Sequence, residues 1–163
     1  MALDPARHSN IDAFASALPP SGRLMGLDLG TKTIGIAVSD TTRLVASSLE
    51  TLTRRKFTLD VEHLQRRSSE HDVVGIVIGL PINLDGTEGP RAQSTRTFTR
   101  LLSDKTPLPL LLWDERLTTI AAERALLEAD TSRKRRAEVI DKVAAGLILQ
   151  GLLDRLRATH NTG

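Results

Sequence analysis

The fold is decided by residues 23–38, which read RLMGLDLGTKTIGIAV. Apolar residues run along 23–29, and successive side chains of a strand point to opposite faces of a sheet. Residues 30–32, Gly-Thr-Lys, offer a tight turn into a second apolar segment over 34–38. The stretch therefore predicts an antiparallel β-hairpin, which begins the folded domain.

Asp28 interrupts the apolar run of the first strand. An ionised carboxylate in such a place costs several kcal/mol unless a metal, a cation or a proton compensates it. A purely structural ion pair, with Lys32 or with an arginine, is the alternative. Asp28 is therefore the strongest indication of function in the sequence.

Strands and helices alternate after the hairpin. The hydrophobic pattern predicts a strand around 44–52, a helix over 57–70, a buried strand over 73–79, a helix over about 90–102, a strand over 108–113, a helix from Thr118 or Thr119 through Glu128 and a last helix over about 137–156. This order is typical of the α/β class, with a mixed sheet that starts as an antiparallel hairpin, continues in parallel strands and carries helices on both faces. We expect one domain over 23–157, between a flexible N-terminal tail, 1–22, and a C-terminal tail, 158–163.

Composition excludes several classes of protein. The 163 residues include no cysteine, so disulfides and thiolate metal sites are ruled out. No apolar run approaches the ~20 residues that cross a bilayer, and the start of the chain does not resemble a secretory signal. A net charge of +2 does not by itself indicate a nucleic-acid partner. We expect a cytoplasmic protein without a membrane partner, as a monomer or homodimer.

Three acidic residues occupy positions typical of an active site. Asp28 lies in a strand, Glu115 directly follows the strand over 108–113, and Asp141 lies in the first turns of the last helix. The carboxyl ends of strands are where open α/β sheets place their sites. Taken singly, Glu115 beside Arg116 and Asp141 beside Lys142 also suit a solvated surface. Together the three acids suit Mg²⁺ or Mn²⁺, and two such ions ~4 Å apart can promote phosphodiester cleavage.

Two further segments are candidates for binding a nucleic-acid backbone. Thr31 and Lys32 lie in the turn after the first strand, where backbone N–H groups and a charge can contact phosphate. The basic run Arg133, Lys134, Arg135 and Arg136 comes shortly before Asp141 in the sequence. A plain hairpin turn and a solvated charged surface are the respective alternatives.

Several motifs resemble those of the YqgF family, in the family's order across about residues 23–153. They are GLDLGTK (26–32), GIA (35–37), VIGLP (77–81), DGTEG (85–89), DERLTT (114–119), IDKVAA (140–145) and ILQ (148–150). Each motif alone is weak, and the set in this order is highly specific.

The resemblance implies a ribonuclease-H-like fold, in the branch of the RuvC-type Holliday junction resolvases. It also implies a hydrolase, a divalent-metal-dependent nuclease that matures the 5′ end of pre-16S ribosomal RNA, with ribosomal particles as further candidate partners. On this resemblance Asp28, Glu115 and Asp141 are the catalytic acids that bind Mg²⁺ or Mn²⁺. RuvC-type resolvases carry a further acid one helical turn after the helix acid, and this chain has Ala144 there. We therefore expect a loosely held second ion and a lesser aptitude for junction resolution.

Three alternatives stay open at this point. They are a Holliday junction resolvase-like DNA endonuclease, a non-catalytic RNA-binding factor for ribosome assembly, and an actin-like or sugar-kinase-like ATPase. The last is suggested by Asp28-Leu29-Gly30-Thr31, which resembles a first phosphate-binding turn. Such ATPases enclose nucleotide between two domains, and 163 residues supply one.

Overall fold

The computed structural model describes residues 8–118, 120 and 133–161, with side chains over 8–118, 120 and 143–159. The elements, in chain order, are α1 (Ile11–Ala17), β1 (Arg23–Leu29), β2 (Thr33–Ser39), β3 (Ala46–Thr53), α2 (Phe57–Glu70), β4 (Val73–Leu80), α3 (Pro90–Ser103), β5 (Leu110–Asp114), the 3₁₀ turn η1 (Glu115–Leu117) and α5 (Arg133–Asn161). No helix among these described residues is long and apolar enough to cross a membrane.

The five strands form one mixed sheet in the order β3-β2-β1-β4-β5. β1 and β2 pair antiparallel, as do β2 and β3, whereas β4 runs parallel to β1 and β5 runs parallel to β4. The predicted hairpin and the mixed α/β sheet are thus confirmed. Because β1, β4 and β5 are parallel, their carboxyl ends meet at one edge of the sheet.

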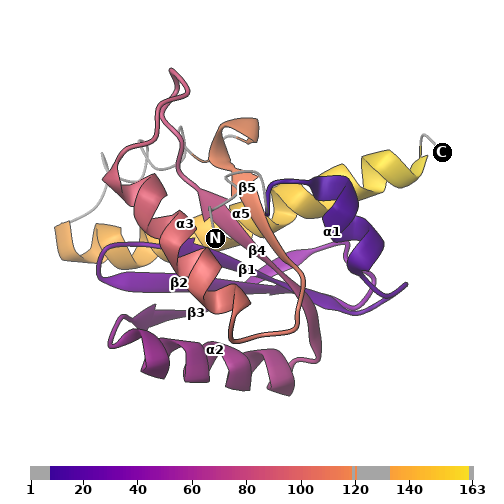
Figure 1. Ribbon diagram of the computed structural model, residues 1–163, viewed down its shortest axis with the longest axis horizontal. Coiled ribbons are helices and arrows are strands. Elements are labelled where there is room, and N and C mark those ends of the chain that lie inside the picture. The colour runs from indigo at the N-terminus through magenta and orange to yellow at the C-terminus, as the bar shows by residue number, and fades with distance from the viewer. Residues whose placement is uncertain (1–7, 119, 121–132, 162–163) are drawn as a thin grey trace.

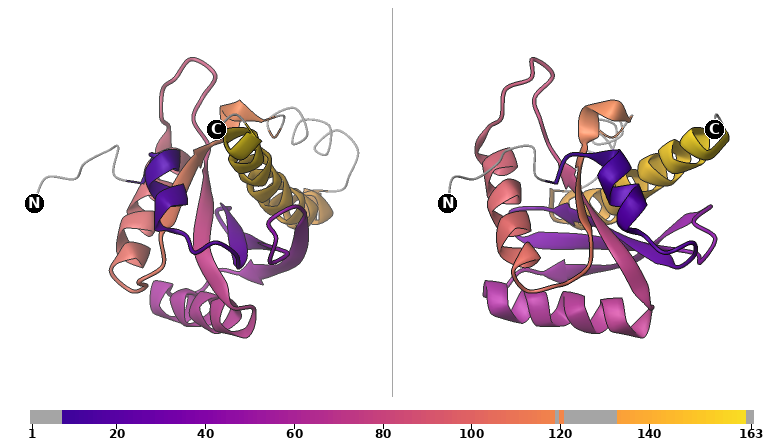
Figure 2. Two further views of the ribbon diagram at one scale, coloured as in Figure 1. Left: turned by 90° about the vertical axis from the view of Figure 1, so that its right-hand side faces the viewer. Right: turned by 45° about the vertical axis from the view of Figure 1, so that its right-hand side comes forward.

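Helices cover both faces of the sheet, with α2 and α3 on one side and α5 on the other (Figures 1 and 2). The core is accordingly split into two clusters. Met25, Leu27 and Leu29 pack with residues of α2 and α3 in the first cluster. Leu24 packs with residues of α5 in the second. Alternation along β1 therefore turns Asp28 toward the face that α5 covers.

Helix α5 packs directly on β1 because Gly26 has no side chain. A Cβ at Gly26 would lie 2.8 Å from Leu149 Cβ and 2.9 Å from the backbone oxygen of Ala145. Ala144 and Ala145 are both buried, at 2% and 0% exposure, so small residues line the helix at this contact. This close approach sets the depth at which α5 lies over the first strand.

The structure differs from expectation at the two termini. Within the segment expected to be a flexible tail, α1 forms a packed helix whose Phe14 is only 4% exposed. Asn10 caps this helix by accepting a hydrogen bond from Ala13 N–H at 3.0 Å. At the other end α5 continues to Asn161, into the segment expected as a C-terminal tail. Burial of one aromatic ring explains α1, since a helix of seven residues has little stability of its own.

The remaining elements lie close to their predicted positions. The helix over 57–70 has the predicted bounds, and the strand from Val73 ends one residue later than expected. The third strand begins two residues later than its prediction, at Ala46. The helix expected through Glu128 lies almost wholly outside the described residues.

Candidate active site

Asp28 is buried near the carboxyl end of β1. Its side chain is 1% exposed, so its charge requires compensation within the protein. Among the described side chains, Arg91 supplies a cation, with its Nη2 3.4 Å from Asp28 Oδ1. The ion pair between Asp28 and an arginine, which the sequence left open as an alternative, therefore exists. The arginine lies in the first turn of α3, 63 positions after Asp28 in the chain.

Glu115 reaches over the neighbouring strand on the same face of the sheet. It begins η1, directly after β5, and is 7% exposed. A Cβ at Gly79 in β4 would lie 2.8 Å from Glu115 Oε1 and 2.3 Å from Ile148 Cδ1 of α5. The carboxylate thus occupies the space that Gly79 leaves empty, on the face covered by α5.

Strand pairing places Asp28 next to this position. Leu27 pairs with Ile78 in the parallel β1–β4 ladder, so the next step along both strands is Asp28 beside Gly79. Gly79 in turn pairs with Trp113 at the end of β5, just before Glu115. Two buried carboxylates therefore lie on one face of the sheet, at the edge where the parallel strands end.

The structure does not place Glu115 beside Arg116 on a solvated surface, which was the alternative for this residue. Arg116 pairs instead with Asp114, with Nη2 2.8 Å from Oδ2 and Nε 3.1 Å from both carboxylate oxygens. These hydrogen bonds hold the pKa of Asp114 below its ordinary value. Trp113 is 3% exposed and packs in the second core cluster.

Asp141 belongs to α5, but its side chain lies outside the described residues. It stands four residues before Ala145, whose backbone contacts Gly26. Ala144, one helical turn after Asp141, is buried inside the second core cluster. Among the described side chains, no group of three or more His, Cys, Asp or Glu is close enough to hold a metal ion.

The predicted backbone-binding segments are described to different extents. Thr31 and Lys32 are exposed in the turn between β1 and β2, at the carboxyl end of β1. This turn is closed by Gly30 N–H, which donates to Thr33 O at 2.8 Å. Residues 133–136 form the start of α5, and their side chains lie outside the described residues. The structure thus brings the turn to the edge that carries Asp28.

A loop over residues 83–89 follows β4 and approaches η1. It is held by Asn83 N–H, which donates to Thr87 O at 2.9 Å, and by Thr87 N–H, which donates to Asp85 at 2.9 Å. A Cβ at Gly86, where φ is +88°, would lie 3.6 Å from Arg116 Nη1. The loop therefore borders the edge of the sheet near Glu115.

The ion pair at the base of this loop predicts an acid-dependent effect on stability. Arg96 donates to Glu88 from Nε at 2.6 Å and from Nη2 at 2.9 Å, and these bonds lower the pKa of Glu88 from 4.5. A group with a lowered folded-state pKa stabilises the fold above its unfolded pKa, and that contribution is lost as the pH falls through the folded value. We expect Arg96→Gln to lower the free energy of unfolding by about 0.5–1 kcal/mol at pH 7.

Urea unfolding of both proteins at pH 7 and at pH 3 checks this. The difference should shrink at pH 3, because Glu88 is then protonated in the unfolded state and the contribution of the ionised pair is being lost. An equal difference at the two pH values would show that the pair does not titrate as described.

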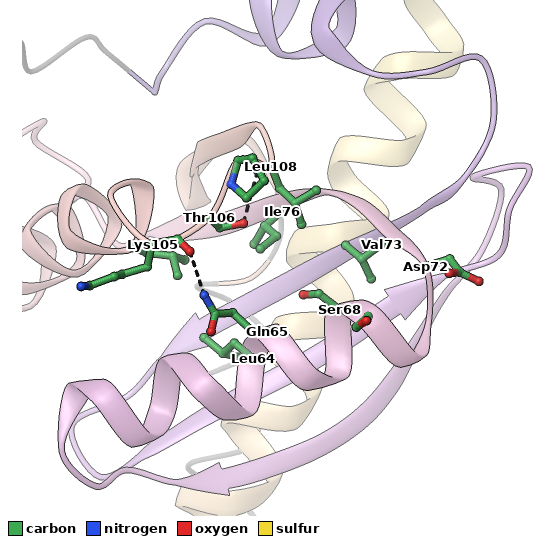
Figure 3. A pocket seen from close by; sticks show the side chains of 12 residues that line it. Leu64, Gln65, Ser68, Asp72, Val73, Ile76, Lys105, Thr106 and Leu108 are labelled. Atoms are coloured by element: carbon green, nitrogen blue, oxygen red, sulfur yellow. Dashed lines mark hydrogen bonds between the residues drawn. The ribbon is translucent and has the colours of Figure 1, made fainter.

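A separate hollow lies on the other side of the sheet, between α2 and the segment that joins α3 to β5 (Figure 3). Its volume is about 390 Å³, and Gln65 Nε2 donates to the Lys105 carbonyl oxygen at 2.7 Å beside it. Leu64, Val73 and Ile76 give it an apolar wall. Neither Asp28 nor Glu115 lines this hollow, so it is distinct from the edge that carries these two carboxylates.

Sequence reasoning did not identify Arg91 as a partner of Asp28. A Pro-Arg pair at the start of a helix is an ordinary feature, and nothing in its spacing points to a strand so far away. The signal in the sequence was Asp28 itself, because a carboxylate in an apolar strand requires a cation to compensate its charge.

Comparison with known proteins assigns the family. The family model described as "RuvX: Holliday junction resolvase" matches residues 22–155. A Cereibacter sphaeroides protein named "Putative pre-16S rRNA nuclease" is 65% identical over 149 residues, which cover 91% of this chain and 93% of that protein. A Paracoccus denitrificans protein of the same name is 65% identical over 153 residues, covering 94% of this chain and 97% of that protein.

The fold has a counterpart among solved structures. T. thermophilus RuvC in complex with a Holliday junction substrate aligns with a TM-score of 0.53 at 10% identity, over 83% of this chain and 96% of that chain. This likeness supports the expected ribonuclease-H-like fold. By the family match and by its relatives, the chain belongs to the RuvX family, which is the family that the YqgF motifs indicated.

Proposed function

We propose that this protein is a divalent-metal-dependent nuclease that hydrolyses phosphodiester bonds in the maturation of the 5′ end of pre-16S ribosomal RNA. The observation that carries the proposal is the pair of buried carboxylates, Asp28 and Glu115, on one face of the sheet at its carboxyl edge. Family membership and the names of the relatives support the reaction and the substrate.

The donors at this edge fit a hard cation such as Mg²⁺ or Mn²⁺. Both described acids offer carboxylate oxygens, which these ions prefer, and the chain has no cysteine to favour a softer metal. Gly79 leaves a space on the sheet that the Glu115 carboxylate enters, beside the strand position of Asp28. Asp28 is 1% exposed, so a cation at this edge would offset the cost of its burial.

Each residue has a proposed task. Asp28, Glu115 and Asp141 would hold the ions, which when bound supply activation of a water and stabilisation of the leaving oxygen. Gly79 lets Glu115 come close to β1, and Gly26 lets α5 lie close to the same strand. Ala144 supplies no fourth carboxylate, so a second ion would be held less firmly. Thr31, Lys32 and the basic run over 133–136 would bind the phosphate backbone.

The description of the family model favours one other substrate, a four-way DNA junction. Ala144 weighs against it, since RuvC-type resolvases carry an acid at that position. We also propose that the protein acts in the cytoplasm, as a monomer or homodimer, with the precursor RNA free or within ribosomal particles.

The test is incubation of the purified protein with a pre-16S RNA fragment and Mn²⁺, followed by mapping of the product ends. A synthetic four-way DNA junction, incubated in parallel, separates the two substrates. We expect cuts at the mature 5′ end and little cleavage of the junction. Symmetric cuts in the junction with intact RNA would favour the DNA substrate, and binding of RNA without any cleavage would indicate a non-catalytic assembly factor.

A further inference from the structure

Arg91 connects the two sides of the sheet at the candidate active site. It is the second residue of α3, after Pro90, and α3 packs on the face opposite to α5. Its guanidinium nevertheless reaches the end of β1, with Nη2 3.4 Å from Asp28 Oδ1 and 3.3 Å from Leu29 O. The Arg91 side chain is 38% exposed, whereas that of Asp28 is 1% exposed. One end of this ion pair is therefore buried and the other faces solvent.

The contact is loose for an arginine beside a carboxylate. Charge-assisted N–H···O bonds are usually about 2.7–2.9 Å long. On the same helix, Arg96 makes two such short bonds with Glu88, at 2.6 and 2.9 Å. The hydrogen bonds from Arg91 to Asp28 and Leu29 of β1 are 3.3 or 3.4 Å long, and of these only the one from Nη2 reaches the carboxylate. Arg91 thus supplies charge to Asp28 without the two-pronged geometry that would fix it there.

A cation on Asp28 and a guanidinium at this distance would repel each other. Like charges a few Å apart repel each other, so the two compete for the same carboxylate. The guanidinium has five N–H donors in a plane, an arrangement that matches phosphate oxygens. Its exposed side faces the solvent from which a nucleic-acid backbone would approach.

We propose that Arg91 is the resident counter-ion of Asp28 in the metal-free protein, and that it transfers to a phosphate of the nucleic-acid backbone when a divalent cation binds. The inference rests on the proposed function, because it takes Asp28 to be a metal-binding acid. Arg91 then acts as a positioning residue. It lies beside the buried carboxylate before the metal arrives, and afterwards holds the substrate next to it.

The first test measures Mn²⁺ affinity of nucleic-acid-free protein by electron paramagnetic resonance titration. We expect Arg91→Gln to bind Mn²⁺ roughly fivefold more tightly than the natural protein, because a partly exposed competitor for Asp28 is removed. Arg96→Gln is the matched control, since it removes the same charge from the same helix, where Arg96 pairs with Glu88. It should bind Mn²⁺ as the natural protein does. Equal affinity of all three proteins, or the same gain in both variants, would overturn the inference.

The second test measures binding to a labelled single-stranded RNA in Ca²⁺ over a range of salt concentrations. Loss of one phosphate contact should lower the slope of log affinity against log salt by about 0.7 in Arg91→Gln. Arg91→Lys should keep most of the slope, because it keeps the charge, and Arg96→Gln should keep all of it. An unchanged slope in Arg91→Gln would show that Arg91 does not contact the backbone. Thermal unfolding in EDTA verifies that every variant is folded.

Asp28→Asn separates this inference from the proposed function. If Asp28→Asn loses Mn²⁺ binding and Arg91→Gln does not gain it, the role of Arg91 is refuted and the metal site stands. If Asp28→Asn binds Mn²⁺ as tightly as the natural protein, the metal site itself is refuted, and the inference falls with it.

Discussion

Replacing Asp28 with asparagine is expected to abolish Mn²⁺-dependent cleavage of a pre-16S RNA fragment, with a loss of at least about 10³-fold in rate. Asparagine has nearly the same size but no charge, so it removes a metal ligand without leaving a cavity in β1. Because Asp28 is 1% exposed, removal of its charge also removes a burial cost. The melting temperature in EDTA should therefore fall little or rise.

The chain offers a closely matched control in Asp60 of α2. Asp60 is also 1% exposed, and its two carboxylate oxygens accept from Arg55 N–H at 3.1 and 3.2 Å. Asp60→Asn makes the same chemical change at the same depth of burial, with no contact to Asp28. It should retain cleavage within about threefold after correction for the folded fraction. Equal loss in both variants would mean that the effect comes from a disturbed fold.

Replacing Gly26 with alanine is expected to have the largest effect on stability among small substitutions at the α5–sheet contact. The new Cβ would lie 2.8 Å from Leu149 Cβ and 2.9 Å from a backbone oxygen of α5, so the helix itself must move. Overpacking of this kind costs about 1–3 kcal/mol. Displacement of α5 would also shift Asp141, so cleavage should fall together with stability.

Gly146→Ala adds the same methyl group to α5 itself, at a position that faces Ser48 of β3. Among the described residues, its Cβ would meet Ser48 Oγ alone, at 3.4 Å, which is ordinary van der Waals distance. Alanine is a better helix former than glycine by roughly 0.5–1 kcal/mol, so this variant should be slightly more stable. Urea unfolding of the two variants should thus give changes of opposite sign. A Gly26→Ala protein as stable as the natural one would contradict the close packing of α5 on β1.

The local hydrophobic pattern predicted the strands of the sheet well, because the arrangement of apolar residues along each strand reflects which of its faces are buried. Alternation around Asp28 assigned the acid to one face of β1, and the two core clusters confirm that assignment. The uninterrupted apolar run from Val73 predicted a strand covered on both faces. The spacing of Ile11, Phe14 and Leu18 allowed a short helix, but a flexible tail was expected there, because burial of Phe14, the tertiary effect that stabilises α1, is not visible in local sequence.

The candidate site could be predicted only in part, for a related reason. That Glu115 follows a strand is visible in the sequence, but its burial depends on Gly79, which lies in a different strand. The cation beside Asp28 comes from α3, and local spacing carries no information about a contact across 63 positions. Roles could therefore be assigned to these side chains only from the register of β1, β4 and β5 together with the motifs.

A crystal structure of the protein grown with Mn²⁺, with the ions located by anomalous scattering, tests the metal site most directly. We predict an ion in direct contact with carboxylate oxygens of Asp28, Glu115 and Asp141 at the carboxyl edge of the sheet. A second, weaker peak should lie near it, in keeping with Ala144. Manganese bound elsewhere, or at this edge without Asp28, would contradict the account.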